Sequence, residues 1–259
     1  MYKGTLEGNI YEIQFVKTFN SNKQQFTNYL NNFSQTNNLW MIRVTSNQFS
    51  KLSNKKVFTR ADCYLAKINA NINNLLIQNS YYLSEEILDD NKIIYEKIPF
   101  SGISIKMTTS ENFQILKLTP HSFKMLFDSY ELGAGASLFC MKKNELEKNP
   151  NLITGWNSSI SAMTEYFFEY TKGNNLFYLN EEICKQIKIY SCQKIKNIVE
   201  NSIELQRKIF NGIGLYEEPY TALYFYHGND LLPLTTIPFN VTTGSGRSKG
   251  DYTLVFKPK

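Results

Sequence analysis

Two strand-like segments of this chain each carry a charged side chain that could take part in chemistry. Residues 101 to 107 alternate strictly, which puts three apolar side chains on one strand face and Ser104 and Lys106 on the other. Upstream, residues 57 to 68 read as a second strand with Asp62 at its middle. Asp and Lys both disfavour strand interiors. We therefore expect the acid and the lysine to work together at one site.

These segments, joined by a polar connection over residues 69 to 97, resemble the core hairpin of the PD-(D/E)xK nucleases, especially the type II restriction endonucleases. In that family an aspartate ends or interrupts one strand, the next strand carries (D/E)-x-K, and the acids hold a divalent ion beside the scissile phosphate. The resemblance implies that Asp62 is the first acid and Lys106 the lysine. Ser104 departs from the pattern, because serine is a poor ligand for a hard cation. Some restriction enzymes have S-x-K here and bring the missing carboxylate from a helix.

Two glutamates are candidates for that missing metal ligand. Residues 5 to 20 have apolar side chains at helical spacing, and Glu12 borders the buried stripe, where an unpaired carboxylate would be costly. Many restriction enzymes have a similar first helix whose glutamate approaches the metal site, so the resemblance favours Glu12. Glu131, near the end of a helix predicted over residues 119 to 132, is the second candidate. The ordinary alternatives are a surface ion pair for Glu12 and a helix end capped by glycines for Glu131.

A glycine-rich segment near the end of the sequence has the composition of a phosphate-contacting loop. Residues 242 to 252 combine three glycines with hydroxyl side chains and two cations. Such a loop offers backbone N–H groups and charge to phosphate, and an arginine can also read guanine through two parallel bonds. It is not a Walker loop, because the required order of residues is absent and a strand follows. A hairpin turn with surface charges is the alternative. The predicted DNA-contacting residues are Ser245, Arg247, Ser248 and Lys249.

The remaining pattern predicts an α/β fold with a mixed central sheet flanked by helices. A helical pattern continues over residues 21 to 38, and the longest one covers residues 181 to 210. Further strands are predicted at residues 39 to 44, 113 to 118, 220 to 226, 231 to 241 and 253 to 256. We expect a single domain over residues 1 to 259, with a catalytic core over roughly 1 to 140 and elements for DNA recognition and dimerisation over roughly 141 to 259.

Composition and charge narrow the functional classes. The 259 residues include 18 Phe and 17 Tyr, which is typical of an ordered globular protein, and the net charge of +5 would suit a polyanionic partner. Four scattered cysteines without C-x-x-C spacing are expected to be structural. There is no apolar run long enough for a membrane span and no signal-peptide pattern, so a cytoplasmic protein is expected. Two histidines without metal-binding spacing argue against histidine metalloenzymes.

The resemblance implies a type II restriction endonuclease, which hydrolyses phosphodiester bonds at a specific sequence in double-stranded DNA with Mg²⁺ and no organic cofactor. Asp62 would bind the ion together with Glu12 or Glu131, while Lys106 would orient the attacking water and offset negative charge, and Ser104 would only hydrogen-bond nearby. A homodimer is expected if the target is palindromic. Arg60 is expected to be a surface arginine, with a pairing to Asp62 or to a phosphate as the alternative. The alternatives are a non-catalytic DNA-binding protein with a degenerate nuclease fold and a protein-interaction module.

Overall fold

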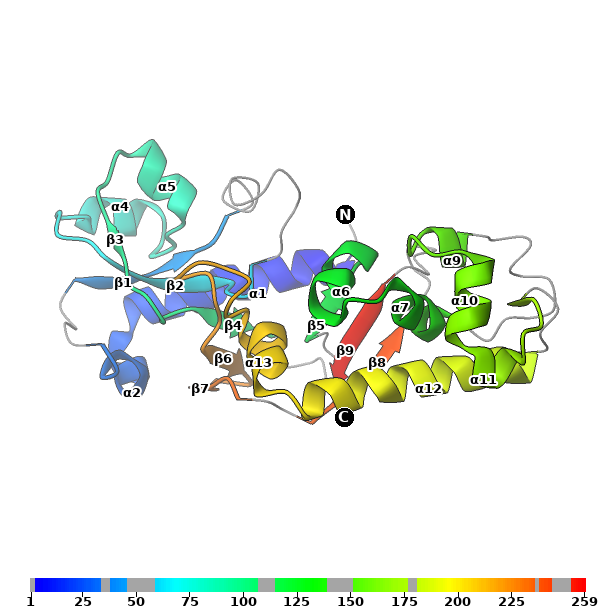
Figure 1. The fold of residues 1–259 in the computed structure, drawn as a ribbon. Coiled ribbons are helices and arrows are strands. Elements are labelled where there is room, and N and C mark those ends of the chain that lie inside the picture. The colour runs from blue at the N-terminus through cyan, green and yellow to red at the C-terminus, as the bar shows by residue number, and fades with distance from the viewer. Residues whose placement is uncertain are drawn as a thin grey trace. The chain divides into compact units, whose positions relative to one another are not determined.

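The structure is a computed structural model that describes residues 3–33, 38–45, 59–106, 115–138, 151–176, 181–235, 238–243 and 253–259. The chain forms two compact units, and each contains two separate stretches of sequence (Figure 1). Unit 1 consists of Met1–Glu111 and Arg207–Thr236, and unit 2 consists of Asn112–Gln206 and Ile237–Lys259. Two late strands, after residue 220, return to the sheet of unit 1.

Among the described residues, unit 1 contains a six-stranded mixed sheet in the order β1-β2-β4-β6-β7, with β3 paired to β2. Neighbouring strands are antiparallel except β4 and β6, which are parallel. In Figure 1, β6 and β7 accordingly lie beside the much earlier β4. The strands are β1 (Leu39–Arg43), β2 (Cys63–Lys67), β3 (Glu96–Lys97), β4 (Ile103–Ile105), β6 (Tyr224–His227) and β7 (Asp230–Pro233).

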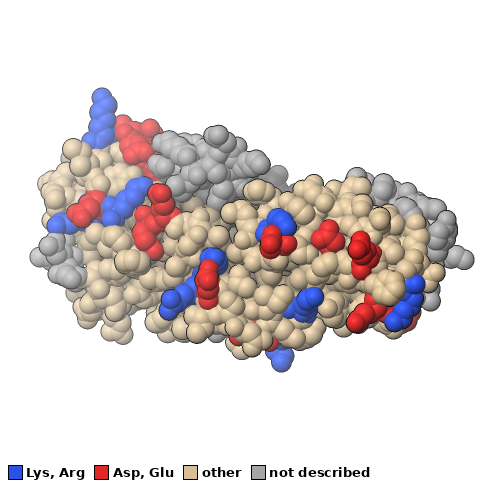
Figure 2. All heavy atoms as spheres, viewed as in Figure 1, with Lys and Arg blue, Asp and Glu red and all other residues tan. Residues whose placement is uncertain are grey.

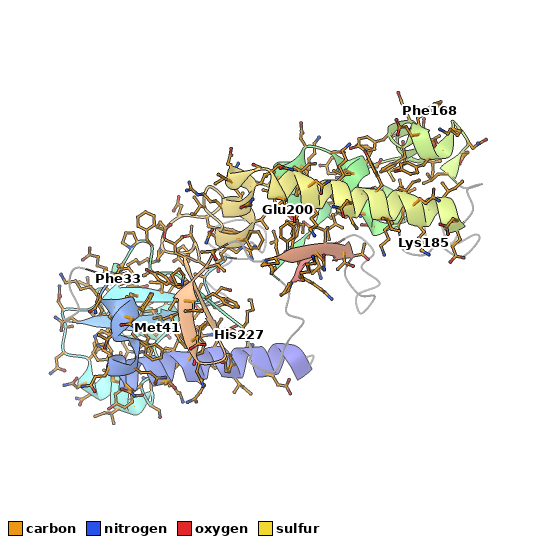
Figure 3. The ribbon with its side chains drawn as sticks, turned by 90° about the horizontal axis from the view of Figure 1, so that it is seen from below. Phe33, Met41, Phe168, Lys185, Glu200 and His227 are labelled. Atoms are coloured by element: carbon orange, nitrogen blue, oxygen red, sulfur yellow. The ribbon has the colours of Figure 1, made fainter. Side chains whose placement is uncertain are left out.

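Helix α1 (Lys3–Ser21) covers one face of this sheet, as the helical spacing of residues 5 to 20 predicts. Its residues Phe15, Val16 and Phe19 are buried against alternate residues of β1, β2 and β4. Asn20 fixes the packing, since its side-chain amide donates to the carbonyl oxygen of Met41 at 2.9 Å and its oxygen accepts from the Met41 N–H at 2.8 Å. Figure 3 shows Met41 in the sheet beside α1. The chain then continues through a 3₁₀ turn (Lys23–Phe26) and α2 (Thr27–Leu30).

The opposite face of the sheet is covered by the segment that the sequence predicted only as a polar connection. It forms α4 (Asn73–Gln78) and α5 (Glu85–Asp90), and these helices pack on the residues of β1 and β2 that alternate with those facing α1. Glu85 is fully buried here and accepts hydrogen bonds from the hydroxyls of Tyr64 and Tyr220 at 2.6 and 2.7 Å. The expected mixed sheet with flanking helices is therefore present.

In the part of unit 2 that the structure describes, a three-stranded antiparallel sheet has the order β5-β9-β8, and α7 and α12 pack against it. Figure 3 shows α12 along its length between Lys185 and Glu200. The strands are β5 (Leu116–Leu118), β8 (Phe239–Thr243) and β9 (Leu254–Pro258). The helices are α6 (Pro120–Phe127), α7 (Tyr130–Ser137), α9 (Asn151–Thr154), α10 (Ile160–Tyr166), α11 (Phe168–Thr171), α12 (Glu181–Glu200) and α13 (Ile203–Gln206).

The helix predicted over residues 119 to 132 is two helices, and Glu131 lies in the first turn of the second helix rather than near the end of the first. Asp128 adopts a left-handed conformation with φ of 53° and ends α6, and Ser129 then caps α7. The glycines that were expected to cap a helix lie inside α7 instead. A Cβ atom at Gly133 would stand 2.2 Å from the Trp156 ring, so this position needs a residue without a side chain for close packing. The predicted glycine caps are wrong for this physical reason.

The long helix predicted over residues 181 to 210 is also interrupted. It ends at Glu200 and is followed by α13 and a π-helical turn (Arg207–Asn211). Gly212, with φ of 79°, ends this turn as predicted.

The structure also bears on the cysteines and on membrane-spanning segments. Cys63, Cys184 and Cys192 are free thiols; the first two are buried and the third is half-buried. Cys140 lies outside the described residues. Within the described ranges, no helix combines the length and the apolar character that crossing a membrane requires.

Candidate active site

The antiparallel pairing of β2 and β4 brings the predicted aspartate and lysine together. Asp62 directly precedes β2, and Lys106 directly follows β4. Cys63 lies opposite Ile103 in the sheet, and the Asp62 N–H donates to the Ile103 carbonyl oxygen at 2.8 Å. Because the start of one antiparallel strand meets the end of its neighbour, both charged residues lie at the same end of the sheet.

The Asp62 carboxylate is held by the backbone and side chains that follow Ile103. Its Oδ2 accepts a hydrogen bond of 2.6 Å from the Ile105 N–H and one of 3.4 Å from the Ser104 hydroxyl. The same oxygen lies 4.0 Å from Lys106 Nζ, and the aspartate and lysine side chains are 23% and 26% exposed. Nothing in the described part of the chain donates to Oδ1. One oxygen of Asp62 is therefore anchored, and the other accepts no hydrogen bond from the described residues.

Glu12 reaches the same region from α1 and is paired with Arg43, the last residue of β1. Both Nε and Nη2 of Arg43 donate to Glu12 Oε2, at 3.0 and 2.7 Å. Arg43 Nη2 also donates to the Asn9 side-chain oxygen at 3.0 Å. The glutamate and arginine side chains are 22% and 18% exposed, so this is a largely buried ion pair rather than the surface pair of the alternative interpretation.

Electrostatics show that Glu12 and Asp62 are close enough to interact. Burial, and then the negative charge of Asp62, raise the pKa of Glu12 to about 7, although Arg43 and Lys106 act to lower it. Arg43 itself loses solvation on burial, yet the charge of Glu12 keeps its pKa above the ordinary value. The site thus combines two partly buried carboxylates with two cations, Arg43 and Lys106.

These side chains fit the ligand requirements of Mg²⁺ but not those of a metal held by protein alone. No group of three metal-binding His, Cys, Asp or Glu side chains occurs among the described residues. Mg²⁺ is commonly bound through one or two carboxylates, with substrate phosphates and waters as the other ligands. The free oxygen of Asp62 and the nearby carboxylate of Glu12 meet that requirement. Their mutual repulsion would also be relieved by a bound cation.

Arg60 is not the surface residue that the sequence predicted. Its guanidinium donates to the Ile209 carbonyl oxygen in the π-helical turn, and burial lowers its pKa to about 10. The charge of Asp62 acts in the opposite direction. Arg60 therefore contributes positive charge near the site while its hydrogen bonding ties the start of β2 to a segment more than a hundred positions later.

Glu131 lies in unit 2, whereas Asp62 and Lys106 lie in unit 1. Its carboxylate accepts hydrogen bonds from the hydroxyls of Ser158 at 3.0 Å and Ser129 at 3.4 Å. A negative charge in the first turn of α7 also interacts favourably with the helix dipole. These contacts account for Glu131 without a metal. The predicted DNA-contacting residues Ser245, Arg247, Ser248 and Lys249 lie outside the described residues.

Sequence reasoning missed Arg43 and Asn9, which the structure adds to the site. A usable signal was present, because Arg43 is the one charged residue in the otherwise apolar strand segment 39 to 44.

The net positive charge does not indicate where a polyanion would bind. On the face shown in Figure 2, basic and acidic side chains are interspersed among the described residues rather than gathered by sign. No protein-family model matches the chain, and no curated protein matches its sequence at a significant level.

Proposed function

We propose that this protein is a Mg²⁺-dependent endodeoxyribonuclease that resembles the type II restriction endonucleases and cuts a specific sequence in double-stranded DNA. One observation carries the proposal. Asp62 and Lys106 lie 4.0 Å apart at one end of the mixed sheet of unit 1. Glu12, far from both in the sequence, reaches the same end through its ion pair with Arg43, which lies opposite the residue after Asp62. Two structural ion pairs, Asp62 with Lys106 and Glu12 with Arg43, are the alternative explanation, and Mg²⁺-dependent cleavage separates it from a metal site.

The order of elements in unit 1 supports a PD-(D/E)xK-like core. A helix supplies Glu12, one strand begins directly after Asp62, and the next strand of the sheet carries the S-x-K segment. Helices cover both faces of the sheet. In the PD-(D/E)xK nucleases, which this chain resembles, the same kinds of element present the acids and the lysine to the phosphate.

The residues have distinct roles in the proposed mechanism. Asp62, through its open oxygen, and Glu12 would hold Mg²⁺, which polarises the phosphate and lowers the pKa of the attacking water when bound. The Ile105 N–H fixes the Asp62 carboxylate, because a bond of 2.6 Å restricts its rotation. Lys106 would hold the water in position and stabilise negative charge that develops on the phosphate oxygens. Ser104 donates to Asp62 and supplies no charge of its own.

Recognition of DNA and assembly of the protein remain predictions. A homodimer is the simplest way to cut both strands of a palindromic site, because protein and DNA symmetry then match. The net charge of +5 favours a polyanion such as DNA. The glycine-rich segment over residues 242 to 252 stays our candidate for DNA contact.

A second candidate function, DNA binding without cleavage, is favoured by one observation. Where the family usually has a third carboxylate, Ser104 offers only a hydroxyl, and that hydroxyl is turned toward Asp62. A site that has lost one acid can retain its fold and its affinity for DNA while it loses catalysis. Metal-dependent cutting separates the two candidates.

The experiment uses purified protein, unmethylated phage DNA and either Mg²⁺ or EDTA, with the products separated on a gel. We expect discrete fragments that require Mg²⁺. Asp62→Asn keeps an oxygen that can accept from the Ile105 N–H but removes the charge, and Lys106→Ala removes the ammonium group. Each should lower the cleavage rate by roughly 100-fold or more, with DNA binding largely retained.

Two exposed residues provide matched controls for these variants. Asp90→Asn and Lys117→Ala make comparable chemical changes at exposed positions and should leave cleavage unchanged. Intact DNA at every enzyme and metal concentration would refute the nuclease proposal. Salt-sensitive binding of that DNA in a gel-shift assay would then support the second candidate. Full cleavage by either site variant would refute the assigned mechanism.

A further inference from the structure

Arg43 occupies a position from which it can control the geometry of the site. It is the last residue of β1 and lies directly opposite Cys63, the neighbour of Asp62. Its own backbone N–H donates to the Leu83 carbonyl oxygen at 3.0 Å, which anchors this end of the strand. The arginine is therefore attached to the same rigid sheet that holds Asp62.

The contacts between Arg43 and Glu12 are unequal for the two carboxylate oxygens. Arginine and a carboxylate often pair with two parallel bonds, one to each oxygen. Here both Nε and Nη2 donate to Oε2, and no described group donates to Oε1. Asn9, which precedes Glu12 by three positions on α1, accepts from the same Nη2. The guanidinium is thus fixed to α1 at two points, and one oxygen of Glu12 stays free.

Without Arg43, Glu12 would have little reason to remain beside Asp62. Two carboxylates repel each other, and the burial of Glu12 adds to the cost of its charge. The free side chain would rotate toward solvent or bind a proton. A lysine could restore the charge, but it has no planar pair of donors and would fix the carboxylate less firmly.

We propose that Arg43 is a positioning residue that holds Glu12 by one oxygen and thereby keeps its other oxygen available as a metal ligand beside Asp62. The proposal rests on the proposed function, since it assigns a metal to the same site. It adds a residue that acts on the metal through Glu12, to which its guanidinium is bonded. Residues that orient metal ligands typically change metal affinity by roughly 10- to 100-fold when they are removed.

The test measures Mn²⁺ binding to the protein without DNA, by electron paramagnetic resonance or calorimetry. The variants are Arg43→Ala, Arg43→Lys, Glu12→Ala and the double variant Arg43→Ala with Glu12→Ala. We expect Arg43→Ala to weaken Mn²⁺ binding by roughly 10-fold or more. Arg43→Lys should lie between this variant and the wild type. The double variant should bind no more weakly than Glu12→Ala alone, because Arg43 acts only through Glu12.

A purely structural role for Arg43 predicts a different pattern. In that case Arg43→Ala would lower the melting temperature, and its effect on Mn²⁺ binding would not depend on Glu12. The two substitutions would then weaken Mn²⁺ binding independently. Arg207→Ala removes an exposed arginine of unit 1 and serves as the control for loss of a positive charge. If Arg43→Ala does not fold, Arg43→Lys provides the comparison, because it retains the buried charge.

Three results would overturn the inference. These are an unchanged Mn²⁺ affinity in Arg43→Ala, additive effects in the double variant, and tighter binding in Arg43→Ala. Tighter binding would mean that the arginine competes with the cation for Glu12. The proposed function is tested separately by DNA cleavage in the wild type. A wild-type protein that binds Mn²⁺ in this Arg43-dependent way but leaves DNA intact would refute the nuclease and retain the inference.

Discussion

Replacement of Glu12 by glutamine should change how the stability of unit 1 depends on pH. The pKa of Glu12 in the folded protein is raised to about 7 from an ordinary value of 4.5, first by burial and then by the charge of Asp62. In the unfolded chain the carboxyl ionises near its ordinary value. Between these two pH values the folded state binds a proton that the unfolded state releases. Stability contributed by this group is therefore lost as the pH rises through this interval.

The size of this effect follows from the difference between the two pKa values. A rise from 4.5 to about 7 corresponds to about 3 kcal/mol in the free energy of unfolding. The full loss is reached only above the folded pKa, where Glu12 is ionised in both states. Glutamine resembles the protonated glutamate and does not titrate. The Glu12→Gln variant should therefore lack this part of the pH dependence. Loss of the anionic partner of Arg43 changes the absolute stability of the variant but not this prediction.

Urea unfolding at pH 5 and pH 8.5, without divalent metal, measures the effect. The wild type should lose about 2.5 kcal/mol more than Glu12→Gln between these two conditions, because the unfolded carboxyl is already partly ionised at pH 5. Glu86→Gln removes an exposed glutamate from the same unit and should follow the wild type. Equal pH dependence in the wild type and in Glu12→Gln would show that Asp62 and burial do not act on Glu12 as the structure indicates.

Two further predictions concern packing. Asn20→Ala removes both bonds to the buried backbone of Met41 and should lower the free energy of unfolding by about 3 kcal/mol in urea melts, because a buried N–H and a buried carbonyl lose their partners. A loss below about 1 kcal/mol would mean that water replaces the amide. Gly133→Ala should lower the melting temperature, since its Cβ would stand 2.2 Å from the Trp156 ring. Gly8→Ala, which places its Cβ in open space beside α1, should instead raise the free energy of unfolding by about 0.5 to 1 kcal/mol. The same sign for both glycine variants would contradict the packing described for α7.

The parts of the fold that sequence patterns predicted are those fixed by local periodicity. Residues 5 to 20 follow a helical repeat and form α1, and the alternating segment 101 to 107 contains β4. Burial of one helix face or one strand face is a property of neighbouring residues, so a single sequence reveals it. Asp62 and Lys106 stood out for the same reason, because charged residues in apolar strands are unusual. Their proximity needed the further assumption that the two strands pair.

The parts that could not be predicted depend on contacts between distant residues. The helix predicted from residue 119 onward is divided by the left-handed backbone at Asp128. A glycine at this position would have indicated a helix end, but an aspartate does not. The place of Gly133 inside a helix depends on Trp156, which lies in the turn after α9 in unit 2. The parallel pairing of β4 with β6 joins residues 103 to 105 to residues 224 to 226, so no local pattern specifies it.

The serine at position 104 can be understood from the charges that surround it. Asp62 and Glu12 already repel each other strongly enough to contribute to a pKa of about 7 for Glu12, and Arg43 and Lys106 only partly compensate. A third carboxylate at position 104 would lie next to Asp62, because the Ser104 hydroxyl stands 3.4 Å from its Oδ2. In the metal-free protein such a charge would add repulsion at a partly buried site. The serine instead donates a hydrogen bond to Asp62. Under the proposed function, a site whose two acids are held by an arginine, a serine and a backbone N–H would need the substrate phosphate to complete the coordination of Mg²⁺.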